Sequence, residues 1–292
     1  MNRILKGISL RRFSALAGLA MLSVASIAAA GPVPPAPLTT GPIYMHFSGY
    51  EYSGATTSYA DNTWGIGKVD SVLTGTVGTP NETINPGGST LFSENPGGHL
   101  YFMFYGLTNN GTFTCGSNTC LNSADGHFDL YYNTNNLTLS SLTTGNRTAA
   151  DAFTGITDQG TLLASFDFVP GVVSGDNTTT LSGTAPGSVI SGSANQGSAT
   201  SYLAVNTAAG GAWASALNSN FFLYNTNGDP LPGAADVYNN TTYYSDPNAS
   251  TTGFNLTYND PATAAFVPEP SSLLIFGAGL IVLGFMSRRR FC

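Results

Sequence analysis

The chain has 292 residues, of which 42% are hydrophobic, and this length accommodates one large β domain or two small domains. Charged residues make up only 9% of the chain, against about 25% in a typical soluble protein. Seven of its 9 Lys and Arg residues lie near the two ends. The segment between them has Lys68 and Arg147 against fifteen carboxylates, a net charge of about −13. This shortage of basic side chains excludes binding of nucleic acid or anionic lipid through a basic cluster.

The first 30 residues have the three parts of an export signal. Residues 1–12 carry four positive charges, residues 13–28 are apolar or small, and Ala28 and Ala30 are the small side chains that a signal-peptidase pocket admits. The pattern predicts a signal peptide over residues 1–30, with signal peptidase as a processing partner. An uncleaved anchor helix and twin-arginine export through Arg11-Arg12 stay open as alternatives.

Proline spacing separates this signal from the body of the chain. Residues 31–42 are rich in proline, which favours an extended backbone and cannot continue a helix. We therefore expect an extended spacer over residues 31–42 and a folded body over residues 43–265.

The body alternates short β-rich runs with clusters of Gly, Asn, Asp, Ser and Thr, which is typical of strands joined by turns. Residues 100–105 are apolar on both faces, as expected for a central strand between two packed layers. The pattern predicts one all-β domain, a β-sandwich of jelly-roll type. Alternation of period two is clearest at residues 43–47, 128–132, 137–139, 162–168 and 254–258.

Two segments of the body lack this alternation. Residues 171–201 are of low complexity, which predicts an exposed loop or a boundary between subdomains. Residues 208–217 come closest to a helical pattern, but Gly210-Gly211 limits the expected helix to a turn or two.

Cys115 and Cys120 enclose a Gly-Ser-Asn-Thr turn. In an exported protein this spacing predicts a small disulfide loop at the tip of a hairpin. The alternative is a zinc site that uses both thiolates and His127, but the sequence offers no fourth ligand nearby. We expect Cys292, beyond the C-terminal arginines, to remain separate and reduced.

The C-terminal region has three parts in a fixed order. Pro268-Glu269-Pro270 keeps the chain extended, residues 273–286 form a short hydrophobic segment, and Arg288, Arg289 and Arg290 form a basic cluster. The positive-inside rule holds this cluster in the cytoplasm. We expect membrane contact through a short hydrophobic helix here.

This arrangement resembles the PEP-CTERM sorting signal over residues 266–292. The resemblance implies that exosortase recognises Pro268, Glu269 and Pro270 and processes the chain, which passes through an inner-membrane intermediate to the cell surface or extracellular matrix of a Gram-negative bacterium. It also implies a role in exopolysaccharide matrix, adhesion or flocculation. A plain membrane anchor without cleavage is the alternative.

Catalytic signals are weak. The chain has none of the common nucleophile, metalloprotease or nucleotide-binding motifs, so we predict no catalytic residue, no metal and no cofactor. A carbohydrate-active hydrolase on the same scaffold stays open, because two carboxylates across a groove suffice for that reaction. The acidic candidates are Glu51, Glu94, Asp125, Asp129 and Asp167. Asp and Asn at residues 123–129 and 225–229 could ligate calcium, but neither segment matches the EF-hand pattern, so we expect turns there.

Hydroxyl-rich, weakly charged surfaces with exposed aromatic rings suit contact with polysaccharide through stacking and hydrogen bonds. We therefore expect an exported, non-enzymatic surface or matrix protein, with a lectin-like module as the second alternative. The aromatic candidates for such contact are Tyr50, Tyr52, Tyr59, Trp64, Tyr243 and Tyr244.

Overall fold

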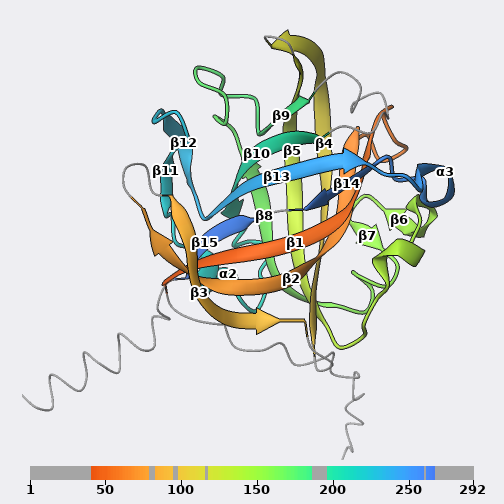
Figure 1. The fold of residues 1–292 in the computed structure, drawn as a ribbon, viewed down its shortest axis with the longest axis horizontal. Helices are drawn as coiled ribbons and strands as arrows, with labels where there is room; N and C mark the ends of the chain where they lie inside the picture. The colour runs from red at the N-terminus through yellow and green to blue at the C-terminus, as the bar shows by residue number, and fades with distance from the viewer. Residues whose placement is uncertain are drawn as a thin grey trace, which may run out of the picture. The chain divides into compact units, whose positions relative to one another are not determined.

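The computed structural model describes residues 41–78, 83–94, 98–115, 118–185, 196–259 and 261–266, all within the unit Gly31–Cys292. Antiparallel strands dominate it (Figure 1). The elements are β1 (Gly41–Ser53), β2 (Thr63–Val77), β3 (Ile84–Ser93), β4 (His99–Cys115), β5 (Asn118–Asn133), η1 (Leu139–Ser141), η2 (Thr144–Asn146), β6 (Arg147–Ala149), β7 (Ala152–Phe153), β8 (Thr161–Val169), β9 (Leu181–Ala185), β10 (Gln196–Val205), α2 (Ala214–Leu217), β11 (Phe222–Tyr224), β12 (Pro230–Ala235), β13 (Val237–Ser245), α3 (Ala249–Thr252), β14 (Leu256–Asn259) and β15 (Ala262–Phe266).

The main sheet closes on itself. β1 pairs with β2 on one side and with β14 and β15 on the other. From β2 the pairing continues through β4, β5, β8, β10 and β13, and β13 pairs in turn with β14 and β15. β9 lies between β5 and β10, and β3 pairs with β2. Closure brings the inner faces of opposite strands into one shared interior, as in a sandwich.

The predicted all-β, sandwich-like fold is confirmed, but the strand order differs from that of a jelly roll. Around the closed sheet, neighbouring strands follow one another along the chain, apart from the small additions β3 and β9. Each connection therefore returns the chain beside the strand it has just left, which is a meander. A jelly roll instead needs Greek-key connections that cross to a distant strand.

Alternation along β1 and β4 explains the interior. Phe47 of β1 and Phe102 of β4 point inward and pack edge to face at a centroid distance of 5.6 Å. Tyr101 and Met103 point the other way and are fully buried in a second cluster outside the sheet. The prediction that residues 100–105 form a strand buried on both faces is thus confirmed.

Glycines in β1 and β2 make room for the inward rings. A Cβ atom at Gly49, Gly65 or Gly67 would come closer than 3.0 Å to the ring of Tyr258, Phe104 or Phe102, respectively. Because real Cβ atoms do not approach so closely, only glycine seats these rings on the inner face.

Residues 134–160 cover the outside of the sheet with η1, η2, β6 and β7 (Figure 1). Leu139 and Phe153 from this segment are buried against Trp64 and Tyr101. The predicted strand at residues 137–139 is wrong, because Leu139 begins the 3-10 helix η1. Leu137 and Leu139 pack against one cluster, which produces the alternation without a partner strand.

The low-complexity segment is also partly a correction. Residues 181–185 form β9 and the strand β10 begins at Gln196, with Thr184 opposite Ser198. These parts belong to the main sheet rather than to a loop or a boundary, and residues 186–195 lie outside the described part. The limited helix is confirmed, since α2 has only 4 residues, with Ala216 and Leu217 packed into the interior.

Candidate functional site

An open groove of about 950 Å³ lies on the outer surface of the closed sheet. Strands β1 and β14 contribute its floor, and the segment after β5 contributes one wall. The groove is lined by Ser48, Gly49, Tyr50, Lys68, Glu94, His99, Thr134, Asn136, Leu137, Thr138, Leu139, Ser140, Tyr244, Thr257, Tyr258 and Asn259.

Strand register places two tyrosines of this groove in one row. Thr257 of β14 is opposite Tyr50 of β1 on one side and opposite Tyr244 of β13 on the other. Directly opposite residues share a face, so the two rings flank the Thr257 hydroxyl, about 10 Å apart at two strand spacings. The next outward row contains Ser48 and Asn259, which are also opposite each other.

The wall segment is held in place by buried polar contacts. The Asn133 side chain accepts a hydrogen bond from Asn135 N at 2.8 Å and donates one to Gly155 O at 3.1 Å. The backbone N–H of Leu137 donates to Tyr101 Oη at 2.7 Å. The exposed side chains of Thr134, Asn136, Thr138 and Ser140 therefore stand on an anchored backbone. This wall presents hydroxyl and amide groups to the groove.

The charged groups at the groove are paired with one another. Lys68 Nζ lies 2.7 Å from Glu94 Oε2 and 3.6 Å from Asp70 Oδ1, and His99 Nδ1 lies 3.3 Å from Glu94 Oε1. The hydrogen bond from Lys68 holds the pKa of Glu94 below its ordinary value. Burial lowers the pKa of Lys68, but the bond to Glu94 outweighs it and the pKa is raised. The positive charge of Lys68 at the groove is therefore compensated by the carboxylate of Glu94.

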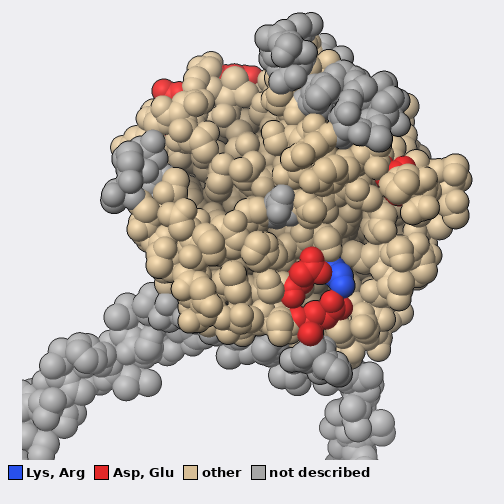
Figure 2. Space-filling view, viewed as in Figure 1, with Lys and Arg blue, Asp and Glu red and all other residues tan. Residues whose placement is uncertain are grey.

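The other basic residue of the body is not available to a ligand. Arg147 forms a bidentate ion pair with Asp61, at 3.0 and 2.7 Å, and both side chains are almost fully buried. Its guanidinium also lies 4.5 Å from the ring centre of Tyr59 and 4.6 Å from that of Trp64. Figure 2 shows one face, where a basic side chain lies within a patch of Asp and Glu atoms, a few further acidic atoms lie near the upper-left and right edges, and most of the remaining described surface is uncharged.

The six aromatic candidates divide into three groups. Tyr50 and Tyr244 line the groove; Tyr244 is 39% exposed, whereas Tyr50 also packs against Phe254 of the outer cluster. Tyr243 lies inside the closed sheet. The remaining three serve the outer cluster, where Tyr52 and Trp64 pack together and Tyr59 contacts Arg147.

The acidic candidates do not converge on one groove. Glu94 lines the outer groove, whereas Glu51 lines the interior of the sheet. Asp129 is buried and accepts hydrogen bonds from Tyr105 at 3.2 Å and from Tyr131 at 3.3 Å. Burial raises the pKa of this carboxyl.

Asp125 and Asp167 lie at other places on β5 and β8. Thr108 Oγ1 donates a hydrogen bond to Asp125 at 3.4 Å. Asp167 Oδ1 lies 2.7 Å from Nδ1 of His127, the residue of the alternative zinc site. Within the described ranges, no three His, Cys, Asp or Glu side chains are grouped as metal ligands.

Of the two segments expected to be turns, residues 225–229 form one, whereas residues 123–129 lie within strand β5 and that expectation is wrong. Asn225 Oδ1 accepts hydrogen bonds from the backbone N–H groups of Asn227, at 2.9 Å, and Asp229, at 3.0 Å. This is the side-chain mimicry of a backbone turn that Asn favours.

Cys115 and Cys120 lie on the hairpin formed by β4 and β5. The backbone of Cys115 is opposite Asn118, and Cys120 is opposite Phe113. Cys120 is buried, with Sγ 3.4 Å from Thr184 Oγ1. The side chain of Cys115 lies outside the described part, so the disulfide stays a prediction.

A sequence comparison identifies the sorting signal in the C-terminal region. The family model of the PEP-CTERM protein-sorting motif matches residues 266–290. The chain carries a PEP-CTERM protein-sorting motif. This motif marks an exported protein that is sorted to the cell envelope by exosortase. No curated protein and no solved structure matches the chain.

Several predicted sites of this chain lie outside the described residues, and their roles stay predictions. They are Ala28 and Ala30 at the signal-peptide cleavage site, Pro268, Glu269 and Pro270 at the exosortase site, Arg288, Arg289 and Arg290 of the basic cluster, and Cys292. Of the described helices, none has the length and apolar character needed to span a membrane.

Sequence reasoning missed most of the groove. The alternation at residues 43–47 and 254–258 predicted two strands, but not that these strands are neighbours. Some 200 residues separate them along the chain. Their juxtaposition depends on closure of the sheet, which no local pattern encodes.

Proposed function

We propose that this exported protein acts in the extracellular matrix, in adhesion or flocculation, by binding polysaccharide in the outer groove without hydrolysing it. The observation that carries the proposal is the row of Tyr50, Thr257 and Tyr244 across three neighbouring strands.

Tyrosine rings and hydroxyl groups complement the apolar and the polar parts of a sugar, respectively. The C–H face of a sugar packs on an aromatic ring, and its hydroxyl groups exchange hydrogen bonds with Thr, Ser and Asn side chains. In the groove, Tyr50 and Tyr244 supply the rings, and the wall that contains Asn136 supplies polar partners. An extended glycan laid across β1, β14 and β13 reaches both rings.

The pairing of charges favours an uncharged glycan. Lys68 is bonded to Glu94, and Arg147 is buried against Asp61, so neither of the two described basic residues presents an unpaired cation. An acidic polysaccharide would meet carboxylates without compensation. We therefore propose neutral polysaccharide as the substrate class.

The state of Glu94 supports binding rather than hydrolysis. A glycosidase general acid needs a raised pKa, and the bond from Lys68 lowers the pKa of Glu94. Glu94 is also the only carboxylate among the described residues that line the groove. A hydrolase needs a second one on the opposite side of the bond.

The test compares two tyrosines of similar exposure. Tyr244→Ala removes a groove ring that is 39% exposed, whereas Tyr224→Ala removes a ring that is 45% exposed on β11, away from the groove. We expect Tyr244→Ala to weaken binding of a neutral polysaccharide about three- to tenfold and Tyr224→Ala to leave it unchanged. The measurement is affinity electrophoresis of the full chain in gels that contain dextran, galactomannan or alginate.

Ionic conditions separate the binding modes. Retention in galactomannan or dextran is expected to persist in 1 M NaCl, where the Debye length is about 3 Å, and in EDTA. Binding to alginate alone that collapses with NaCl would contradict the proposal, as would equal effects of the two tyrosine variants. Release of reducing ends from any of the three polymers would point to the hydrolase instead.

A further inference from the structure

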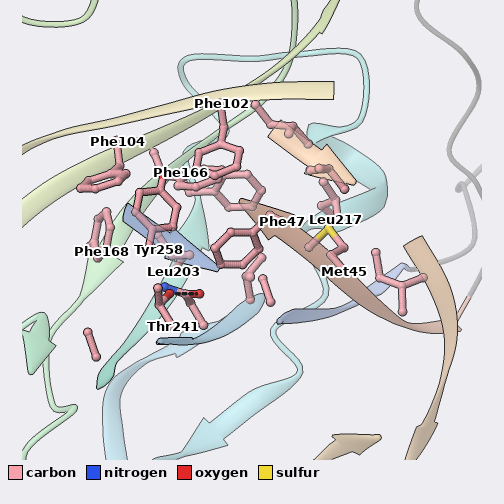
Figure 3. Close-up of a pocket in the computed structure, with 18 of the residues that line it drawn as sticks. Met45, Phe47, Phe102, Phe104, Phe166, Phe168, Leu203, Leu217, Thr241 and Tyr258 are labelled. Carbon is pink, nitrogen blue, oxygen red and sulfur yellow. Dashed lines mark hydrogen bonds between the residues drawn. The ribbon is translucent and has the colours of Figure 1, made fainter. Parts of the chain in front are cut away.

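A cavity of about 80 Å³ lies inside the closed sheet. Figure 3 shows the rings of Phe47, Phe166 and Tyr258 converging between the strands, with Met45 and Leu217 side by side next to them. Nearly all of its wall is aromatic or aliphatic. Apolar cavities of this kind stay dry and admit small apolar molecules.

One end of the cavity is acidic. Glu51 of β1 has the same inward parity as Phe47 and lines both this cavity and an adjoining one of about 40 Å³. The two cavities also share Leu181, Ala199 and Tyr243. A molecule in this space therefore meets the carboxyl group of Glu51.

Burial alone shifts the pKa of the Glu51 carboxyl, with no contribution from a hydrogen bond, and the residue is only partly buried. A polar group that faces an apolar wall gains from a ligand that supplies a hydrogen bond. Burial raises the pKa of Glu51 to about 8, so at neutral pH the group is an uncharged donor. Tyr243 and Tyr258 are the titratable groups that face it, and burial raises the pKa of both.

We propose that this interior is a binding site for a small uncharged molecule whose apolar body carries one hydrogen-bond acceptor directed at Glu51. Ketones, aldehydes and short esters have this chemistry. A dry cavity of about 150 Å³ admits benzene, so the two adjoining spaces accommodate about four or five non-hydrogen atoms. The site shares only Tyr258 with the lining of the outer groove and does not depend on polysaccharide binding.

Charged ligands fit this interior poorly. A carboxylate would lose its hydration inside an apolar wall without compensation from Glu51, and an ammonium ion would require Glu51 to ionise as well, so that two charges would be buried there. Water alone would form a hydrogen bond with the carboxyl group of Glu51 but would remain in contact with the apolar rings around it. An uncharged molecule satisfies both surfaces at once.

The test uses two molecules of the same shape. 2-Butanone and 2-methylbutane differ by the exchange of a carbonyl oxygen for a methyl group, so only the ketone accepts a hydrogen bond. Saturation-transfer NMR on the full chain at pH 6 is expected to show 2-butanone bound with a dissociation constant of about 0.1–1 mM, at least fivefold tighter than 2-methylbutane. At pH 9.5 Glu51 is ionised, and this preference is expected to disappear.

A pair of variants locates the bound ketone. Ala199→Leu fills the space at the boundary of the two cavities, and it is expected to weaken 2-butanone binding at least about tenfold. Ala209→Leu makes the same change in an exposed turn after β10 and is expected to have no effect. Circular dichroism checks that both variants are folded.

Three results would overturn the proposal: no ketone binding to the wild-type chain, equal affinity for the two probes, or unchanged ketone binding by a folded Ala199→Leu. If Ala199→Leu does not fold, the comparison of the two probes at pH 6 and pH 9.5 decides on the wild-type chain alone. Tyr244→Ala is expected to bind 2-butanone normally, so failure of the groove proposal is distinguishable from failure of this one.

Discussion

The ion pair of Arg147 and Asp61 shows how single residues fix the surface chemistry of this protein. Burial by itself raises the pKa of Asp61, but hydrogen bonds from Arg147, Thr57 and Gly106 outweigh it and the pKa is lowered. The pair ties β6 to the turn before β2. A chain with so few basic residues thus uses one of them inside the protein, where it contributes to folding rather than to ligand binding.

Glu51 gives a testable dependence of stability on pH. Its pKa is raised from 4.5 to about 8 in the folded state, so the folded chain binds a proton that the unfolded chain has lost over this range. The contribution of Glu51 to the free energy of unfolding is fully present below pH 4.5 and is lost as the pH rises toward 8. Glu51→Gln removes the effect. We expect the variant to gain stability over the wild type between pH 5 and pH 8.5, by at most about 5 kcal/mol.

Urea unfolding of both chains at the two pH values measures this difference. Each chain is compared with itself across pH, so a constant effect of the amide cancels. A stability difference between the two chains that stays the same at pH 5 and pH 8.5 would show that Glu51 is already ionised at pH 5.

At the scale of elements, the pairing of glycines with rings determines how β2 and β4 pack. A Cβ at Gly67 would collide with the ring of Phe102, whereas a Cβ at Gly233 of β12 would meet no atom within 4 Å. We expect Gly67→Ala to destabilise the protein by about 1–3 kcal/mol through overpacking, and Gly233→Ala to change its stability by less than about 1 kcal/mol. Urea unfolding compares the two, and equal effects would mean that the ring moves aside freely.

The hairpin of β4 and β5 carries the predicted disulfide. Four residues separate Cys115 and Cys120, so the bond removes little entropy from the unfolded chain. We expect the Cys115→Ser and Cys120→Ser double variant to lose at most about 2–3 kcal/mol. Thiol labelling of natively exported protein, followed by mass spectrometry, checks the bond itself, and two labelled cysteines would contradict it.

At the scale of the whole molecule, the sorting motif predicts how the mature chain differs from the translated one. Residues 1–30 and the basic cluster at Arg288–Arg290 are expected to be absent from surface-released protein, because a signal-peptidase site is predicted at one end and the exosortase motif lies at the other. Intact mass spectrometry checks both ends. A dominant species that retains Arg288 would favour simple anchoring over cleavage.

Closure of the sheet produces the two candidate binding sites on opposite faces of the same strand. Along β1, Tyr50 turns outward to the groove and its neighbour Glu51 turns inward to the cavity. Because side chains alternate in a strand, one element serves a polar surface and an apolar interior.

The sequence by itself determined the sorting motif, the all-β class and the shortage of basic residues in the body, and it predicted the N-terminal export signal. These properties depend on composition or on short local patterns, such as Pro268-Glu269-Pro270 before a hydrophobic segment. The pairing of β1 with β14, the burial of Arg147 and the inward position of Glu51 were decided only by the tertiary structure. Each depends on contacts between residues far apart in the chain, which closure of the sheet creates. A local pattern cannot indicate such contacts: the alternation of Leu137 and Leu139 reflects packing against the outer cluster and was wrongly interpreted as a strand.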